Sequence, residues 1–269
     1  MPHADQPIGV FDSGVGGLSV LNALRAELPQ ERFVYFADTG HAPYGERDDA
    51  FVAQRSLAVG ADLVERHAIK AFVVACNTAT AAAIHLLRAA HPTLPLVGVE
   101  PALKPAVALS HTRRVAVLAT RSTLASAKFA ALRTSFAEQA SFITVPCDGL
   151  ARAIEAGDAT EIAALCARYM AAAGPFGTAP GQVDTVVLGC THYPFVADEL
   201  RRHADPSVRL IDTGIPVAQQ TRRLLTSQGA LGTGTGGLTL ESSGDLAALQ
   251  AAATRWRDSL RAPVEHTGV

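Results

Sequence analysis

Cysteine is scarce in this chain, and its spacing excludes two common uses. The 269 residues include four cysteines, and no two of them form a C-x-x-C pair; they are Cys76, Cys147, Cys166 and Cys190. This pattern argues against a zinc site and against a fold held together by disulfides. We therefore predict no metal site, and we expect four reduced thiols, as is usual in the cytoplasm.

The chain also lacks long apolar runs and an excess of charge, and it has few aromatic residues. No stretch reaches the roughly 18 uninterrupted apolar residues of a membrane-spanning helix, and residues 1–7 show no leader pattern. The formal net charge of −2 gives no basic field for nucleic acid or an anionic membrane. Aromatic residues make up 6% and hydrophobic residues 48%. We predict a globular cytoplasmic protein with neither kind of partner.

Two stretches of the sequence echo one another, and each contains a cysteine. They are residues 71–78 (AFVVACNT) and residues 185–192 (TVVLGCTH). Each starts with an apolar run long enough for one buried strand, and a helical pattern follows. Each cysteine is thus expected at the carboxyl end of a strand, where an α/β sheet binds its ligand. Two thiols at equivalent positions predict a pair that acts on one substrate from opposite sides.

Strands and helices alternate along the rest of the chain, which predicts an α/β fold. Two prolines in residues 100–106 suggest a crossing into a second domain, and residues 209–214 are expected to return to the first. We predict two similar domains, each a mainly parallel sheet flanked by helices, with the active-site cleft between them. The first domain is residues 1–98 plus 211–269, and the second is residues 99–210.

A glycine-rich turn, residues 12–17 (DSGVGG), follows the first expected strand. Such a turn points backbone N–H groups at an anion, but it matches neither a Walker loop nor the full dinucleotide pattern. Asp12 would repel a phosphate, so an ammonium group or a group that needs a base fits better. Residues 38–47 are rich in turn formers, and residues 229–237 are expected to form a surface loop.

The cysteines also have a purely structural interpretation. A cysteine that ends an apolar strand is usually a small buried hydrophobe, and this is the interpretation for Cys147 and Cys166. Cys76 and Cys190 differ, because polar residues that need partners follow each of them. A helix N-terminus beside a thiol also favours its thiolate.

The other candidates have structural interpretations too. Asp12 could cap a helix, and Tyr44 with Gly45 could form only a turn. Glu155 on a helix would ordinarily be a solvated surface residue. His192 could be a core histidine, but its place two residues after the second strand-ending cysteine indicates proton handling equally well.

Taken together, several motifs resemble those of the glutamate racemase family. They are IGVFDSGVGGL from residue 8, DT at 38–39 with PYG at 43–45, CNTA at 76–79, and GCTHYP at 189–194. Any one of them is weak, but the joint match is specific and runs in the family's order from residue 8 to about residue 255.

The resemblance implies a racemase that needs no cofactor, takes glutamate as its small-molecule substrate and supplies D-glutamate for peptidoglycan. It implies that Cys76 takes the α-proton from D-glutamate and Cys190 takes it from L-glutamate. Asp12 would assist near the first thiol and His192 near the second. Hydroxyl, amide and backbone N–H groups would hold the substrate, and the implied set is Asp12, Ser13, Tyr44, Gly45, Asn77, Thr78, Thr191, His192 and Glu155.

Other functions stay open at this point. An aspartate racemase-like enzyme would share the paired thiols and handle a shorter side chain. A non-catalytic amino-acid-binding or regulatory protein would retain only the cleft. A cysteine hydrolase built on Cys190 and His192 fits less well, because it leaves Cys76 idle and because residues two apart need not meet. The sequence also leaves a homodimer open.

Overall fold

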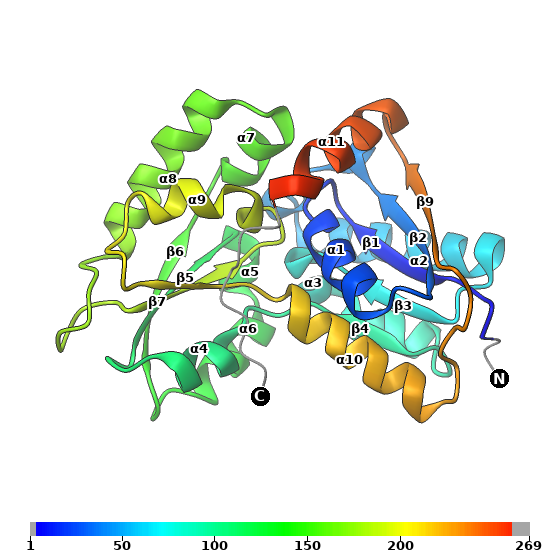
Figure 1. The fold of residues 1–269 in the computed structure, drawn as a ribbon, viewed down its shortest axis with the longest axis horizontal. Helices are drawn as coiled ribbons and strands as arrows, with labels where there is room; N and C mark the ends of the chain where they lie inside the picture. The colour runs from blue at the N-terminus through cyan, green and yellow to red at the C-terminus, as the bar shows by residue number, and fades with distance from the viewer. Residues whose placement is uncertain (1–3, 260–269) are drawn as a thin grey trace.

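Two parallel β-sheets form the centre of the fold, which we describe from a computed structural model covering residues 4–259. Figure 1 shows the two sheets in separate halves of the molecule, each flanked by helices. The strand order is β4-β3-β1-β2-β9 in the first sheet and β6-β5-β7-β8 in the second. The strands of the first sheet are β1 (Ile8–Asp12), β2 (Arg32–Ala37), β3 (Ala71–Val74), β4 (Leu96–Gly98) and β9 (Gly237–Ser242). Those of the second are β5 (Arg114–Ala119), β6 (Ser141–Pro146), β7 (Thr185–Gly189) and β8 (Arg209–Ile211).

The helices of each half follow its strands along the chain. Those of the first half are α1 (Leu18–Glu27), α2 (Asp49–His67), α3 (Asn77–Ala90), α10 (Gly214–Ser227) and α11 (Leu246–Ser259), with the short 3-10 helices η1 (Thr39–His41) and η2 (Tyr44–Glu46). Those of the second half are α4 (Leu103–Leu109), α5 (Arg121–Ala125), α6 (Ala127–Thr134), α7 (Leu150–Ala156), α8 (Ala159–Ala173), η3 (Tyr193–Val196) and α9 (Ala197–Arg201). None of these helices, all within residues 4–259, has the length and apolar character required to cross a membrane.

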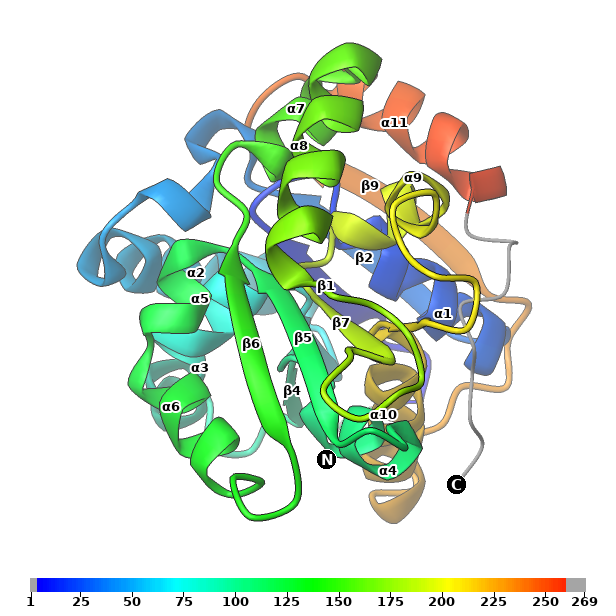
Figure 2. The ribbon, with the colours of Figure 1, turned by 90° about the vertical axis from the view of Figure 1, so that its left-hand side faces the viewer.

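The central strands are largely apolar because helices cover both faces of a parallel sheet. Every residue of β1, β3 and β7 is buried. Figure 2 shows β6, β5 and β7 of the second sheet side by side. One apolar cluster joins the halves, since it contains Val10 of β1 together with Leu118 of β5 and Val186 of β7. The predicted fold class, two mainly parallel α/β units, is confirmed.

The chain leaves the first sheet after β4 and returns after β8. Because β8 pairs with β7, residues 209–211 still belong to the second sheet. The next helix, α10, packs against α1 of the first half, and β9 then joins the edge of the first sheet beside β2. The domain limits after residues 98 and 210 stay a prediction, and residues 1–3 and 260–269 of the first domain lie outside the described part.

A buried ion pair anchors the glycine-rich segment before β9, which the sequence suggested was a surface loop. Nζ of Lys70 lies 2.6 Å from Oε2 of Glu31, and it also donates to the carbonyl of Ala230 at 2.8 Å. The other Glu31 oxygen accepts from Gly232 N–H at 2.7 Å. Both charged side chains are almost wholly buried. The segment is therefore tied to the base of the first sheet, although several of its residues are exposed.

Candidate active site

The candidate residues gather where the carboxyl ends of the two sheets meet. Asp12 is the last residue of β1, Cys76 follows β3 by two residues, and Cys190 directly follows β7. Because all strands of a parallel sheet end at the same edge, these side chains share one region. A cavity lies there, and it encloses about 610 Å³ of space when its part open to solvent is included.

Residues from both halves line this cavity. From the first half come Ser13, Ala42, Pro43, Tyr44, Gly45, Glu46, Cys76, Asn77 and Thr78. From the second half come Thr120, Arg121, Cys147, Asp148, Gly149, Ala151, Arg152, Glu155, Cys190, Thr191 and His192. Every residue predicted for the site is present except Asp12, which lies buried behind the wall.

Cys76 sits at the N-terminus of α3, as the sequence predicted. Its backbone is extended and its Sγ accepts the N–H of Ala79 at 3.4 Å. Ser13 Oγ lies 3.8 Å from the same sulfur. The expected preference for the thiolate is wrong for the free protein, because burial and then the charge of Asp12 raise the pKa of Cys76 to about 12. One helix N–H does not outweigh those two effects.

Cys190 and His192 do meet, although an extended segment would not require it. The chain turns directly after β7, with Tyr193 N–H donating to the carbonyl of Cys190 at 3.1 Å. This turn brings Nδ1 of His192 to 3.6 Å from Sγ of Cys190. The other ring nitrogen, Nε2, lies 2.6 Å from Oε1 of Glu155.

His192 is held in its protonated form. Burial alone would lower its pKa, but the hydrogen bonds to Cys190 and Glu155 raise the pKa well above the usual value. The pKa of Glu155 is lowered, since the bond and charge of His192 outweigh the opposing effect of burial. The imidazolium therefore donates from Nδ1 to the sulfur and from Nε2 to the carboxylate. The two thiols thus have different neighbours, a carboxylate beside Cys76 and a cation beside Cys190.

The glycine-rich turn of residues 12–17 holds two of the protein's own carboxylates. Gly14 N–H donates to Oδ1 of Asp12 at 3.0 Å, and Val15 N–H donates to Oε1 of Glu155 at 2.8 Å. A Cβ at Gly14 would lie 1.9 Å from that Oε1 atom. A side chain at residue 14 would therefore displace the Glu155 carboxylate from the turn.

Asp12 connects the two halves rather than capping a helix. Its carboxylate accepts from Ser13 Oγ at 3.0 Å and from Thr191 Oγ1 at 2.9 Å, while α1 begins only at Leu18. Burial raises the pKa of Asp12, and the charge of His192 offsets that effect only in part. Ser13 lies near Cys76 and Thr191 adjoins Cys190, so Asp12 acts on both thiol regions through hydroxyl groups.

Asn77 presents a buried amide to the cavity. The residue is 4% exposed, and neither Oδ1 nor Nδ2 has a hydrogen-bond partner among the described residues. Buried polar groups are normally paired, so such an amide is a candidate ligand group. The neighbouring Thr78 hydroxyl lies 3.1 Å from the hydroxyl of Thr120, which reaches over from the second half.

Comparison with known proteins identifies the family. A sequence model described as Asp/Glu/Hydantoin racemase matches residues 16–221. The chain belongs to this racemase family. A glutamate racemase from Pseudomonas syringae pv. tomato is 49% identical over 247 residues, which are 91% of this chain and 88% of the relative.

Solved structures of racemases share the fold. The glutamate racemase isoform RacE1 from Bacillus anthracis superposes with a TM-score of 0.84 at 26% identity, covering 94% of each chain. The glutamate racemase of Francisella tularensis in complex with D-glutamate gives 0.82 at 25% identity, covering 95% of this chain and 94% of that one.

Several lining residues of this racemase were not predicted as site residues. The strand and polar turn of residues 115–123 carried the signal for Thr120, because they repeat the scheme of the two cysteine strands. No sequence pattern marked Arg121 and Arg152 as site residues, since exposed arginines on short helices are common. Cys147 was interpreted as a buried hydrophobe, and it is buried, but it also lines the cavity.

Proposed function

We propose that this racemase interconverts L- and D-glutamate with two thiols and without a cofactor. The observation that carries the proposal is that Cys76 and Cys190, from equivalent ends of two sheets, line one cavity as free thiols. The identity with glutamate racemases over nine-tenths of the chain supports glutamate as the substrate. So does the likeness to the Francisella enzyme, whose structure contains D-glutamate.

Inversion at an α-carbon removes a proton from one face and returns a proton to the other. In the L-to-D direction, the sulfur of Cys190 takes the α-proton and the thiol of Cys76 donates its proton to the opposite face. The products are D-glutamate, a Cys190 thiol and a Cys76 thiolate, and the reverse reaction exchanges these roles. The raised pKa of Cys76 suits this direction, because it keeps that residue protonated before L-glutamate binds.

The carbon acid is far weaker than either thiol, so the site must stabilise the transition state. His192, protonated and oriented by Glu155, donates a hydrogen bond to the sulfur of Cys190. Asp12 orients Ser13 beside Cys76. When D-glutamate binds, its ammonium group brings a positive charge that counters the effect of Asp12 on Cys76.

We assign the substrate's polar groups to the remaining lining residues. The amide of Asn77 can donate to a carboxylate and accept from an ammonium group. The hydroxyls of Ser13, Thr78 and Thr191 provide further contacts. Tyr44 and Gly45 begin η2, where N–H groups lack intrahelical partners, so we assign these two residues to the substrate through their backbone.

The biological role follows from the product. We propose that the protein acts in the cytoplasm and supplies D-glutamate for peptidoglycan. Four free cysteines support a reducing compartment. A homodimer stays a prediction, and sedimentation velocity tests it.

Proton NMR in deuterated water, with no added cofactor, tests the proposal. With L-glutamate we expect the α-proton signal and the optical rotation to decay together, and with L-aspartate we expect neither change. Exchange with aspartate alone would keep the mechanism and change the substrate. Glutamate binding without exchange would make the protein a non-catalytic binder, and the proposal would be wrong.

A further inference from the structure

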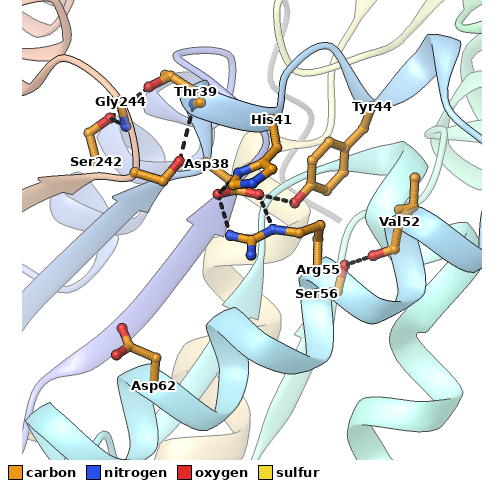
Figure 3. A network of polar contacts seen from close by, with 12 residues as sticks. Asp38, Thr39, His41, Tyr44, Val52, Arg55, Ser56, Asp62, Ser242 and Gly244 are labelled. Atoms are coloured by element: carbon orange, nitrogen blue, oxygen red, sulfur yellow. Dashed lines mark hydrogen bonds and ion pairs between the residues drawn. The ribbon is translucent and has the colours of Figure 1, made fainter.

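A second polar network stands beside the cavity, and its centre is the buried carboxylate of Asp38 (Figure 3). Asp38 follows β2 at the same edge of the sheet as Asp12. Arg55 of α2 donates to both oxygens, at 3.0 Å from Nε and 2.8 Å from Nη2. The hydroxyl of Tyr44 donates to Oδ2 at 2.5 Å, and Nδ1 of His41 lies 3.0 Å from Oδ1. Arg55, Tyr44 and His41 together make these four contacts with the carboxylate of Asp38.

The carboxylate is charged at any physiological pH. Burial raises the pKa of Asp38, but hydrogen bonds from Arg55 and Tyr44 outweigh burial and lower it to about 2. The bidentate arginine contact is the strong, geometrically defined kind. Asp38 therefore holds its acceptor atoms in fixed places.

This network uses the polar group of Tyr44. Tyr44 is 1% exposed, and its ring packs edge-on against Phe11 and Phe51, with centroids 6.1 and 6.4 Å away. Its hydroxyl donates its single proton to Asp38, and Figure 3 shows the side chain pointing to that carboxylate. The proton of this hydroxyl is therefore not available to a substrate.

The part of Tyr44 that remains for the cavity is its backbone. The segment Pro43–Gly45 lines the cavity, and the second half contacts its far side, because Ser122 Oγ donates to the carbonyl of Gly45 at 2.8 Å. A Cβ at Gly45 would come within 3.0 Å of Thr120. The segment Pro43–Gly45 thus forms one wall of the cavity. Asp38 holds this wall through Tyr44, and Ser122 of the second half holds it through Gly45.

We propose that Asp38 and Arg55 are positioning residues, which fix the Pro43–Gly45 wall through the Tyr44 hydroxyl and so set the affinity for substrate. The inference rests on the proposed function, since it needs a substrate that binds this wall. It assigns Tyr44 a role through its backbone only. Neither Asp38 nor Arg55 lines the cavity, so both act through Tyr44.

Steady-state kinetics with L- and D-glutamate tests the proposal on Asp38→Asn, Tyr44→Phe, the double variant and Arg55→Lys. We expect KM to rise about tenfold in both single variants at Asp38 and Tyr44, with kcat changed less than threefold. The double variant should raise KM no further than the larger single effect, because both changes break one contact. Arg55→Lys keeps the charge but loses the bidentate geometry, and a smaller rise is expected.

Asp184→Asn is the matched control. Asp184 is also buried and accepts hydrogen bonds from Ser110, His111, Thr112 and Thr185, but it lies at the amino end of β7, away from the cavity. We expect it to lower the thermal midpoint and leave KM unchanged.

Four results would overturn the inference. Additive KM effects in the double variant would mean that the Tyr44 hydroxyl contacts the substrate itself. A lowered thermal midpoint with unchanged KM in Asp38→Asn and Tyr44→Phe would mean that these residues have a structural role only. If Asp38→Asn does not fold, the KM of Tyr44→Phe alone decides between the two roles. A wild-type protein that racemises neither amino acid would remove the proposed function and this inference together, whereas a racemising wild type with unaffected variants removes the inference alone.

Discussion

Replacing Asn77 by alanine should weaken substrate binding without weakening the fold. The buried amide has no hydrogen-bond partner among the described residues, and an unpaired buried polar group costs about 1–3 kcal/mol. Asn77→Ala removes that cost from the free protein, so its thermal midpoint should stay the same or rise. The same change deletes two hydrogen bonds that we assign to the substrate.

The size of the kinetic effect follows from the charge of the substrate groups. A hydrogen bond to a charged group contributes about 1.5–3 kcal/mol, so two of them amount to about 3–6 kcal/mol. At roughly 1.4 kcal/mol per tenfold change, kcat/KM should fall by about 10²–10⁴. Coupled assays of initial rate in both directions measure it, and a thermal melt of the same sample measures stability.

Thr80, one turn along α3, is the matched control for Asn77. Its hydroxyl is buried but fully used, since it donates to the carbonyl of Val74 at 3.2 Å and accepts from Val99 N–H at 3.0 Å. Thr80→Val should lower the thermal midpoint by a few degrees, because the carbonyl of Val74 and the N–H of Val99 both lose their hydrogen bond to this hydroxyl. It should leave kcat/KM unchanged. The reasoning fails if Asn77→Ala destabilises the protein as Thr80→Val does while reducing kcat/KM less than tenfold.

Three further variants test other parts of the account. Lys70→Met should lower the free energy of unfolding in urea by about 3–5 kcal/mol, because it leaves the Glu31 carboxylate buried without its partner; an unchanged urea midpoint would refute this. Cys147→Ala should keep kcat within a few-fold, and loss of racemisation would show that a third thiol takes part. The raised pKa of His192 means that its protonated form is lost as pH rises through the folded-state pKa. Glu155→Gln lowers that pKa, so the alkaline limb of the kcat/KM profile should move to lower pH, and an unmoved limb would contradict the assignment.

The sequence predicted the fold, and it predicted that the candidate residues gather at one place, because both depend on local patterns. Apolar runs that end in a cysteine define the strands and their carboxyl ends, and parallel pairing then brings Cys76 and Cys190 to a shared edge. The match of motifs to a known family identified the polar residues between them. None of these inferences requires a side-chain conformation.

The unpredicted features depend on contacts between distant residues. The sequence placed Cys76 at a helix N-terminus, but it could not show that Asp12 and burial would together raise its pKa. The turn after β7 that brings Cys190 and His192 together has no strong sequence signature. The hydroxyl of Tyr44 bonds to Asp38, six residues away across a loop. Side-chain direction decides each of these points, and the chain order of the residues does not contain it.

The most direct test of the two-thiol mechanism follows the isotope in each enantiomer. The wild-type protein converts L-glutamate in deuterated water, the reaction is stopped within the first few per cent, and mass spectrometry analyses the separated enantiomers. With one thiol on each face, the D-glutamate formed should contain deuterium at the α-carbon, and the remaining L-glutamate should contain almost none. Deuterium in the unreacted L-glutamate at the rate of product formation would mean that one base serves both faces, and it would contradict the roles assigned to Cys76 and Cys190.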